Sequence, residues 1–179
     1  MGCSNTAFFI MKRIGLLSDT HGFLDPVIFD HFSNCDEVWH AGDFGSLELV
    51  KQLQNFKPLR GVYGNIDDRE VRTAFPLDLR FELEGLDIMM THIGGYPGRY
   101  NRRVKMVMET NSPSLFICGH SHILKVIYDK KYQCLHLNPG ACGHFGFHKI
   151  RTLLRFELNN GKVQNADVIE LGLRSRLPV

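Results

Sequence analysis

The sequence predicts an α/β fold in which two packed β-sheets carry helices on their outer faces. Two patterns favour this class. Between residues 13 and 63, short apolar strands alternate with amphipathic helices, the order of right-handed βαβ units around a parallel sheet. After Pro76, strands outnumber helices and indicate a mostly antiparallel half. The 179 residues are enough for one domain that buries roughly two-thirds of its unfolded surface.

Cap and turn residues mark the elements of the first half. Asp25-Pro26 opens a helix, because proline suits the first helical turn, and Val27 and Phe32 belong to its apolar stripe. Ser46 is expected to cap a second helix that ends near residue 55. The expected strands of this half are residues 13–18, 36–41 and 58–63.

The second half is rich in strands. A helix is expected over residues 99–110, and Asn160-Gly161 favours a type I′ turn between the last two strands. The expected strands are residues 77–83, 86–91, 114–118, 124–128, 133–137, 150–158 and 163–169.

Composition narrows the class of protein. The formal net charge is only +2, and acidic and basic residues are interleaved, so the chain lacks the clustered basic excess of a nucleic-acid binder. No apolar run is long enough to span a bilayer, and no membrane association is expected. Five cysteines without a C-x-x-C pair indicate reduced thiols in a cytoplasmic protein.

The first ten residues are expected to be an extension that precedes a single domain over residues 11–179. Met11 immediately precedes the first strand, so the natural start is open between Met1 and Met11. Residues 1–6 also match a loose myristoylation pattern.

Polar side chains follow five of the expected strands, at the point where each strand ends. Because ligands of α/β sheets bind beyond the carboxyl ends of the strands, these loops are expected to converge. Taken singly, an aspartate or asparagine after a strand is usually a turn residue. Together they offer the oxygen and nitrogen donors that Zn, Fe and Mn accept. These residues are Asp19, His21, Asp43, Asn65, His92, His120 and His122.

The order of these motifs resembles that of the calcineurin-like metallophosphoesterases. Within that superfamily, the chain resembles the small single-domain bacterial and archaeal phosphodiesterases. The resemblance covers residues 12–171 and implies a four-layer α/β/β/α sandwich of two mixed sheets. It implies two divalent metal ions per chain, with Asp43 as the bridging ligand and Asp43, Asn65 and His92 as catalytic residues. One ion would be held by Asp19, His21 and His122, and the other by Asn65, His92 and His120.

The resemblance implies hydrolysis of phosphodiesters. Paired metal ions polarise phosphoryl oxygens and lower the pKa of a bridging water, whose hydroxide then attacks phosphorus in line with the leaving group. Paired metals also serve amide hydrolysis, so the reaction class depends on the resemblance. Mn is the expected metal, and Fe, Zn, Co and Ni also suit the donor set.

One position departs from the family pattern. Many relatives have a histidine after the Gly-Asn pair, thought to protonate the leaving oxygen, where this chain has Ile66. Asp67 and Asp68 are alternative acids, although capping of a helix that starts near Arg69 is the expected role. Without a general acid, aryl diesters should be cleaved better than alkyl diesters.

Other residues are weaker candidates. His40 is expected to support the site from behind the ligands. Arg99 belongs to a basic run that ends at Lys105. This run is either a solvated helix face or a source of a contact to the substrate phosphate, and Arg99 is the candidate for that contact. The turn Asn138-Pro139-Gly140-Ala141 is a family feature that also suits a plain turn. Four histidines receive no site role: His31, His136, His144 and His148.

Three alternatives remain beside the phosphodiesterase. The chain is similar in size to the scaffold subunit of the retromer coat, a non-catalytic interaction protein, but its ligand set is complete. A phosphomonoesterase and a nuclease are the other two, and the near-neutral charge argues against the nuclease. The expected partner is a small phosphodiester such as a nucleotide-derived diester, with no stable nucleic-acid complex, and a homo-oligomer is left open.

Overall fold

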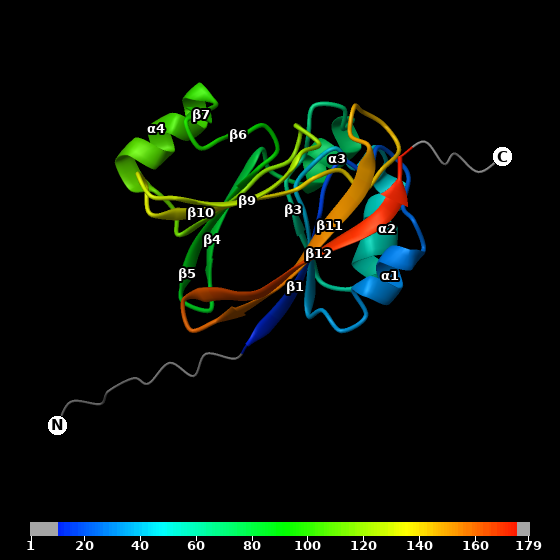
Figure 1. Cartoon of the computed structure of the whole chain (residues 1–179). Coiled ribbons are helices and arrows are strands. Elements are labelled where there is room, and N and C mark those ends of the chain that lie inside the picture. The colour runs from blue at the N-terminus through cyan, green and yellow to red at the C-terminus, as the bar shows by residue number, and fades with distance from the viewer. Residues whose placement is uncertain (1–10, 175–179) are drawn as a thin grey trace.

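The computed structural model describes residues 11–174 and confirms the α/β class with two mixed sheets. Each sheet has five strands, and the two pack face to face with helices outside (Figure 1). Three apolar clusters join the layers: one between the sheets, one under the helices of the first sheet, and one under the helix of the second. The expected four layers are therefore present. The predicted extension over residues 1–10 lies outside the described residues.

The first sheet has the order β12-β11-β1-β2-β3. Strands β1, β2 and β3 are parallel, and β11 pairs antiparallel with both β1 and β12. The strands are β1 (Lys12–Leu17), β2 (Glu37–His40), β3 (Leu59–Gly61), β11 (Ile150–Asn159) and β12 (Lys162–Leu173). The helices on its outer face are α1 (Val27–His31), α2 (Leu47–Phe56) and α3 (Arg69–Ala74).

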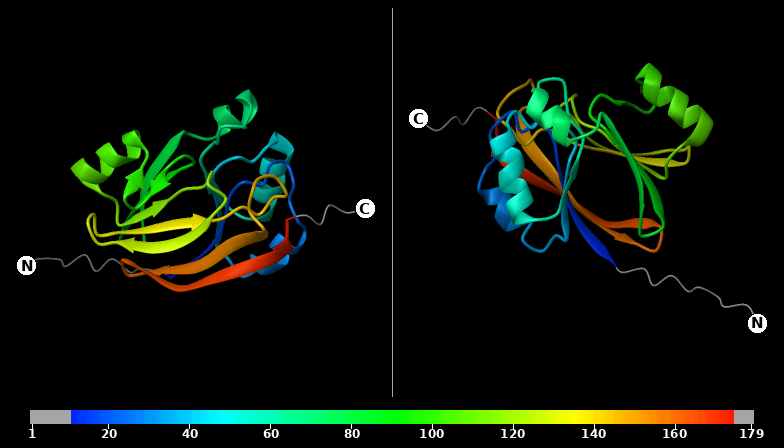
Figure 2. Two further views of the ribbon diagram at one scale, coloured as in Figure 1. Left: turned by 45° about the horizontal axis from the view of Figure 1, so that its top comes forward. Right: turned by 180° about the vertical axis from the view of Figure 1, so that it is seen from behind.

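The second sheet has the order β4-β5-β8-β10-β9, and its three central strands are parallel. Its strands are β4 (Asp78–Leu83), β5 (Leu86–Thr91), β8 (Leu115–Ile117), β9 (Leu124–Asp129) and β10 (Cys134–Pro139). A small hairpin of β6 (Gly95–Tyr96) and β7 (Arg99–Tyr100) leads into α4 (Arg102–Asn111), which lies at the far side of the molecule from α1 and α2 (Figures 1 and 2).

The prediction of a parallel half followed by a mostly antiparallel half is confirmed for β1 to β3 and for most strand pairs after Pro76, but not for the centre of the second sheet. Helix α4 connects β5 to β8 as a crossover, so these strands are parallel in the middle of the second sheet. The last two strands return to the first sheet, where β11 pairs with β1. Both sheets are consequently mixed, because pairing partners depend on where a crossover places the chain and not on strand order alone.

Two helices differ from their predicted limits. Helix α1 has only five residues, and Val27 is exposed, so the apolar stripe is shorter than expected. Helix α4 begins at Arg102, because the Asn101 side chain caps it by accepting from the Arg103 backbone N–H. Arg99 belongs instead to the hairpin strand β7.

Several local predictions are confirmed. Ser46 caps α2 by accepting from the Leu49 N–H, and Asp68 caps α3. Asn160 and Gly161 have φ values of 53° and 74°, as a type I′ turn requires. The tip of this β11–β12 hairpin meets the β4–β5 turn, where Gly161 N–H donates to the Glu84 carbonyl at 2.7 Å (Figure 2). No helix within residues 11–174 is long and apolar enough to cross a membrane.

Trp39 is the largest fully buried side chain and connects the two sheets. It comes from β2 and packs edge-on against Phe81 of β4 and Phe156 of β11, at ring-centroid distances of 5.3 and 5.8 Å. Its indole N–H donates to the Glu37 carboxylate at 3.0 Å. Glu37 in turn pairs with Arg60, so the polar edge of the ring is satisfied.

Replacing this ring should weaken the contact between the sheets. Trp39→Ala is expected to lower the free energy of unfolding by about 3–5 kcal/mol, because it leaves a cavity between them. Urea denaturation of the metal-free protein measures the change. The control Phe147→Ala removes a fully exposed ring and should shift the free energy by less than about 0.5 kcal/mol. Equal effects of the two substitutions would contradict this account of the core.

Candidate metal centre

The polar residues predicted to converge do so at one edge of the two sheets. Asp19 and His21 follow β1, Asp43 follows β2, and Asn65 follows β3. The second sheet contributes His92 after β5, and His120 and His122 after β8. Backbone hydrogen bonds join the loops: Asp19 N–H donates to Gly42 O, and Gly119 N–H to His92 O, both at 3.0 Å.

The side chains form two neighbouring groups of possible ligands. Within each group the ligand atoms lie within 4.8 Å of one another. The groups are Asp19, His21 and His122, and Asp43, His92 and His120. They touch, because His21 Nε2 of the first lies 3.7 Å from Asp43 Oδ2 of the second. Asn65 adjoins the second group, with its Oδ1 3.2 Å from His92 Nε2.

The tautomer of His92 follows from its hydrogen bonds. Its Nδ1 lies 2.8 Å from the Ala41 carbonyl, an acceptor, so the proton is on Nδ1. The lone pair of Nε2 consequently faces Asp43 Oδ2 at 3.2 Å and Asn65 Oδ1. A lone pair opposite a carboxylate is repulsive unless a cation, either a proton or a metal, lies between them.

His122 is oriented in the same way through a second histidine. His148 Nε2 donates to the Gly143 carbonyl at 3.1 Å, so its Nδ1 is an acceptor. His122 Nδ1, at 3.3 Å, must be the donor in that contact. The lone pair of His122 Nε2 then faces Asp19 Oδ1 at 3.1 Å. Sequence reasoning gave His148 no site role, because it lies in a glycine-rich loop 26 positions after His122 and no motif links the two histidines.

The residues fit divalent metal ions. Asp19 Oδ1 is buried and has no hydrogen-bond partner among residues 11–174, although imidazole nitrogens surround it. Burial keeps the pKa of His21 and of His120 below the ordinary value, which favours the neutral, metal-binding imidazole. Burial alone would also lower the pKa of His92, but Asp43 and Asp19 raise it. The carboxylates thus favour positive charge at this position, which a metal ion supplies.

Five of the seven residues have left-handed backbones. Asp19, His21, Asp43, His120 and His122 have φ values between 50° and 65°. The Asp19–His21 and His120–His122 pairs therefore do not converge through the alternation of an extended chain. The strand ends, and the left-handed turn then aims each side chain back over the sheet edge. Such conformations are costly for non-glycine residues and cluster at functional sites.

Glycines let the loops approach the ligands. A Cβ at Gly64 would lie 2.0 Å from Asp43 Oδ1, and one at Gly42 would lie 2.6 Å from His92 Nδ1. Either contact would displace a ligand side chain.

Asp67 is a structural centre of the site that sequence reasoning missed. Its buried carboxylate accepts from the backbone N–H groups of Asp43, Gly45 and Gly64, at 3.1, 2.8 and 2.7 Å. It therefore fastens the loop after β2 to the loop after β3. Because both carboxylate oxygens accept from backbone donors and the side chain is buried, Asp67 is not free to replace the missing leaving-group acid.

His40 lies directly beneath the loops, as the sequence suggested. It is fully buried and stacks on Phe44, with the ring centroids 3.7 Å apart. Its Nδ1 accepts from Gly42 N–H, so its Nε2 donates to the Thr20 hydroxyl at 2.9 Å. Burial lowers the pKa of His40 to about 3, so the ring is neutral. It links the loop after β1, through the Thr20 hydroxyl, to the backbone of the loop after β2.

Two other candidates are placed differently. Arg99 is exposed and lines a hollow with Lys105 and Lys131 that includes none of the predicted metal ligands, whereas Arg103 of the same basic run borders Asn65 and His92. Asn138 is buried, and its amide donates to the Gly119 carbonyl at 2.9 Å. The turn that Asn138 begins thus holds the loop that carries His120.

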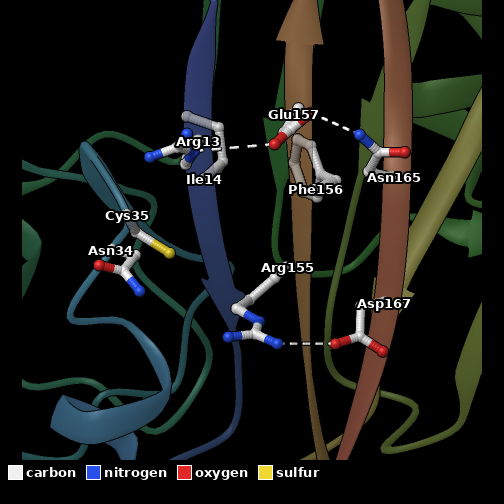
Figure 3. A pocket seen from close by; sticks show the side chains of 9 residues that line it. All are labelled: Arg13, Ile14, Asn34, Cys35, Arg155, Phe156, Glu157, Asn165 and Asp167. Atoms are coloured by element: carbon white, nitrogen blue, oxygen red, sulfur yellow. Dashed lines mark hydrogen bonds and ion pairs between the residues drawn. The ribbon is translucent and has the colours of Figure 1, made fainter.

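A separate cavity of about 250 Å³ lies at the opposite end of β1, on the first sheet (Figure 3). Its arginines already have partners: Arg155 pairs with Asp167 at 2.8 Å, and Arg13 with Glu157 at 3.7 Å. Because its charges neutralise one another and it has no cluster of metal ligands, it is a poorer candidate for a phosphate-binding site than the metal-ligand cluster.

Two relatives are similar to this chain over most of their own length. A probable metallophosphoesterase of Methanocaldococcus jannaschii is 30% identical over 148 residues, which are 76% of this chain and 73% of that protein. A phosphodiesterase of the same organism is 26% identical over 147 residues, 73% of this chain and 84% of the relative.

Solved structures show the same fold. A Thermotoga maritima protein is 27% identical, with a TM-score of 0.69 over 89% of this chain and 99% of that one. Vps29 of Chaetomium thermophilum has a TM-score of 0.70 over 91% and 99% of the two chains, but only 13% identity. The family model of the calcineurin-like phosphoesterase superfamily domain matches residues 11–161. These residues include all seven predicted ligands, and the chain belongs to the calcineurin-like phosphoesterase superfamily.

Proposed function

We propose that this protein is a dinuclear metal-dependent phosphodiesterase. The observation that carries the proposal is the convergence of imidazole lone pairs on buried carboxylates at Asp19 and Asp43. Such an arrangement needs cations. Because the chain belongs to the calcineurin-like phosphoesterase superfamily, we infer that these cations are metal ions that serve phosphoester hydrolysis. A relative named as a phosphodiesterase favours diesters over monoesters.

Two sets of residues would hold the ions. Asp19, His21 and His122 form one set, and Asn65, His92 and His120 the other, with Asp43 shared. When bound, divalent ions would neutralise phosphoryl charge and supply an activated water, and Mn is the metal we expect. Fe, Zn, Co and Ni also suit this mixture of imidazole and carboxylate donors.

The chain's own residues prepare the site before substrate arrives. Ile66 N–H donates to Asp43 Oδ1 at 3.0 Å and leaves Oδ2 directed at His92 and His21. Asn65 presents its side chain beside His92, where it also borders the substrate approach. The Ile66 side chain, 45% exposed, offers no proton to a leaving group.

The scaffold alternative has less support. The structural likeness to Vps29 is a likeness of fold at 13% identity. This chain keeps a full set of seven donor side chains. The left-handed backbones of five of them, and the fixed tautomers of His92 and His122, serve no evident purpose in a scaffold. We further propose that the protein is cytoplasmic, since its four described cysteines are free thiols. Its proposed substrate is a small diester, and we expect no stable complex with nucleic acid.

Loss of the shared ligand tests the activity. Chelator-stripped protein given Mn²⁺ should hydrolyse bis-(p-nitrophenyl) phosphate, and Asp43→Asn should reduce kcat/KM by more than about a hundredfold, because it weakens both metal sites. The matched control Asp30→Asn changes an exposed carboxylate on α1 and should retain the wild-type rate. Turnover of p-nitrophenyl phosphate alone would favour a monoesterase, and no turnover with any metal would favour a scaffold.

The absence of a general acid at Ile66 should affect which leaving groups the enzyme releases quickly. Aryl diesters are expected to react faster than alkyl diesters, because an alkoxide needs a proton as it leaves. Ile66→His should raise the alkyl rate by about 10²–10⁴-fold and change the aryl rate little. Initial rates for a matched aryl and alkyl series measure both. Equal wild-type rates for the two classes, with chemistry rate-limiting, would contradict the prediction.

His148 is proposed as a positioning residue that fixes the tautomer of His122. His148→Phe removes the acceptor and should weaken metal binding by about 10–100-fold, the usual effect of losing a partner behind a ligand. Calorimetric titration with Zn²⁺ measures the affinity. The control His144→Phe changes a neighbouring histidine that bonds to Arg174 O, away from the ligands, and should bind as wild type does. Equal affinities for both variants would show that His148 does not orient His122.

A further inference from the structure

A cavity of about 350 Å³ opens beside the second group of ligands. Asn65 and His92 form the end of the cavity nearest the metal centre, and Arg103 also lines it. Its volume is near the lower end of the range for small-molecule pockets, roughly 300–1,000 Å³. A molecule whose phosphoryl group lay at the ligand cluster would therefore extend a neighbouring group of modest size into this space.

Apolar side chains form much of its wall. Leu77 and Ile93 line it and are 44% and 38% exposed, and Tyr63 contributes its ring. Large aliphatic side chains left open to water beside a candidate catalytic site indicate a surface that a ligand covers. Ile66, next to Asn65 in the chain, adds to the exposed apolar surface on this side.

The two arginines of the cavity are already engaged. Arg103 forms an ion pair with Asp78 and donates to the Thr91 hydroxyl at 3.0 Å. Arg72 donates to the backbone carbonyls of Asp67 and Asn65 at 2.7 and 2.9 Å. Asp78 offsets the charge of Arg103, and Arg72 uses two donors on the loop while its guanidinium lies over the Tyr63 ring, so neither arginine is free to anchor a second phosphate and the cavity favours an uncharged group.

We propose that this cavity binds one organic arm of the phosphodiester, an uncharged and largely apolar group about the size of a single aromatic ring. The inference deepens the proposed function, on which it rests. Leu77 and Ile93 would contact the flat arm, while the phosphoryl group lies beside His92. Nucleobase-like and aryl esters meet this description, whereas a sugar phosphate or a second anionic group does not.

Comparing the binding of two phosphonates separates the contribution of the organic arm to the affinity from that of the anionic group. Phenylphosphonate and methylphosphonate share the phosphonate group and differ in the ring. Calorimetry with Zn²⁺-loaded protein should show phenylphosphonate binding at least about tenfold tighter, from the apolar area it buries. In NMR spectra, phenylphosphonate should shift the methyl signals of Leu77 and Ile93, and methylphosphonate should not.

Polar substitutions locate the effect. Leu77→Asn and Ile93→Asn should each lower the ratio of the two affinities by at least about fivefold, the scale for losing apolar pocket contacts. The controls Val126→Asn and Ile127→Asn alter exposed apolar residues on β9 and should keep the wild-type ratio. Circular dichroism checks that each variant folds.

The outcomes distinguish the two proposals. If wild-type protein binds both phosphonates equally, or the Leu77 and Ile93 variants keep the wild-type ratio, the cavity is not the site of the arm and the proposed phosphodiesterase stands. If wild-type protein with metal binds neither phosphonate, the proposed function fails and the cavity assignment fails with it.

Discussion

The carboxylates of Asp19 and Asp43 are buried within a few ångströms of imidazole nitrogens that present lone pairs to them. The direction of those lone pairs is fixed from outside: the Ala41 carbonyl orients His92, and His148 orients His122. Isolated buried charges cost several kcal/mol, so this edge of the molecule is complete only when positive charge occupies it. The loops, their left-handed turns and the glycines beside them all serve this arrangement.

Both sheets are needed to assemble it. The first sheet supplies the carboxylates and the second supplies three of the four histidines, so the packing around Trp39 sets, within each ligand group, the position of the second-sheet histidines relative to the first-sheet ligands. One side of the resulting site is apolar, with Ile66 exposed next to Asn65 and the Leu77–Ile93 cavity beyond it. For the proposed phosphodiesterase, an apolar flank and an isoleucine in place of a leaving-group acid favour diesters whose aryl or heteroaryl leaving groups depart as stable anions.

Much of this structure follows from local sequence. The strand ends, the Ser46 and Asp68 caps, the Asn160-Gly161 turn and the convergence of the seven polar residues were all predicted, because each depends on nearby residues or on strand polarity. Two mixed sheets were predicted from the family resemblance, but the pairing of β11 with β1 was not, since these strands meet across most of the chain. Asp67 and His148 were missed for the same reason: their roles come from contacts that only the folded loops create.

The most direct test of a two-ion centre is anomalous X-ray diffraction from crystals soaked with Mn²⁺. The account predicts two peaks per chain, one between Asp19 and His122 and one between His92 and His120, with the carboxylate of Asp43 adjoining both. It also predicts that the left-handed backbones at Asp19 and Asp43 are the same with and without metal. A single peak, no peak, or peaks away from these side chains would contradict the central claim.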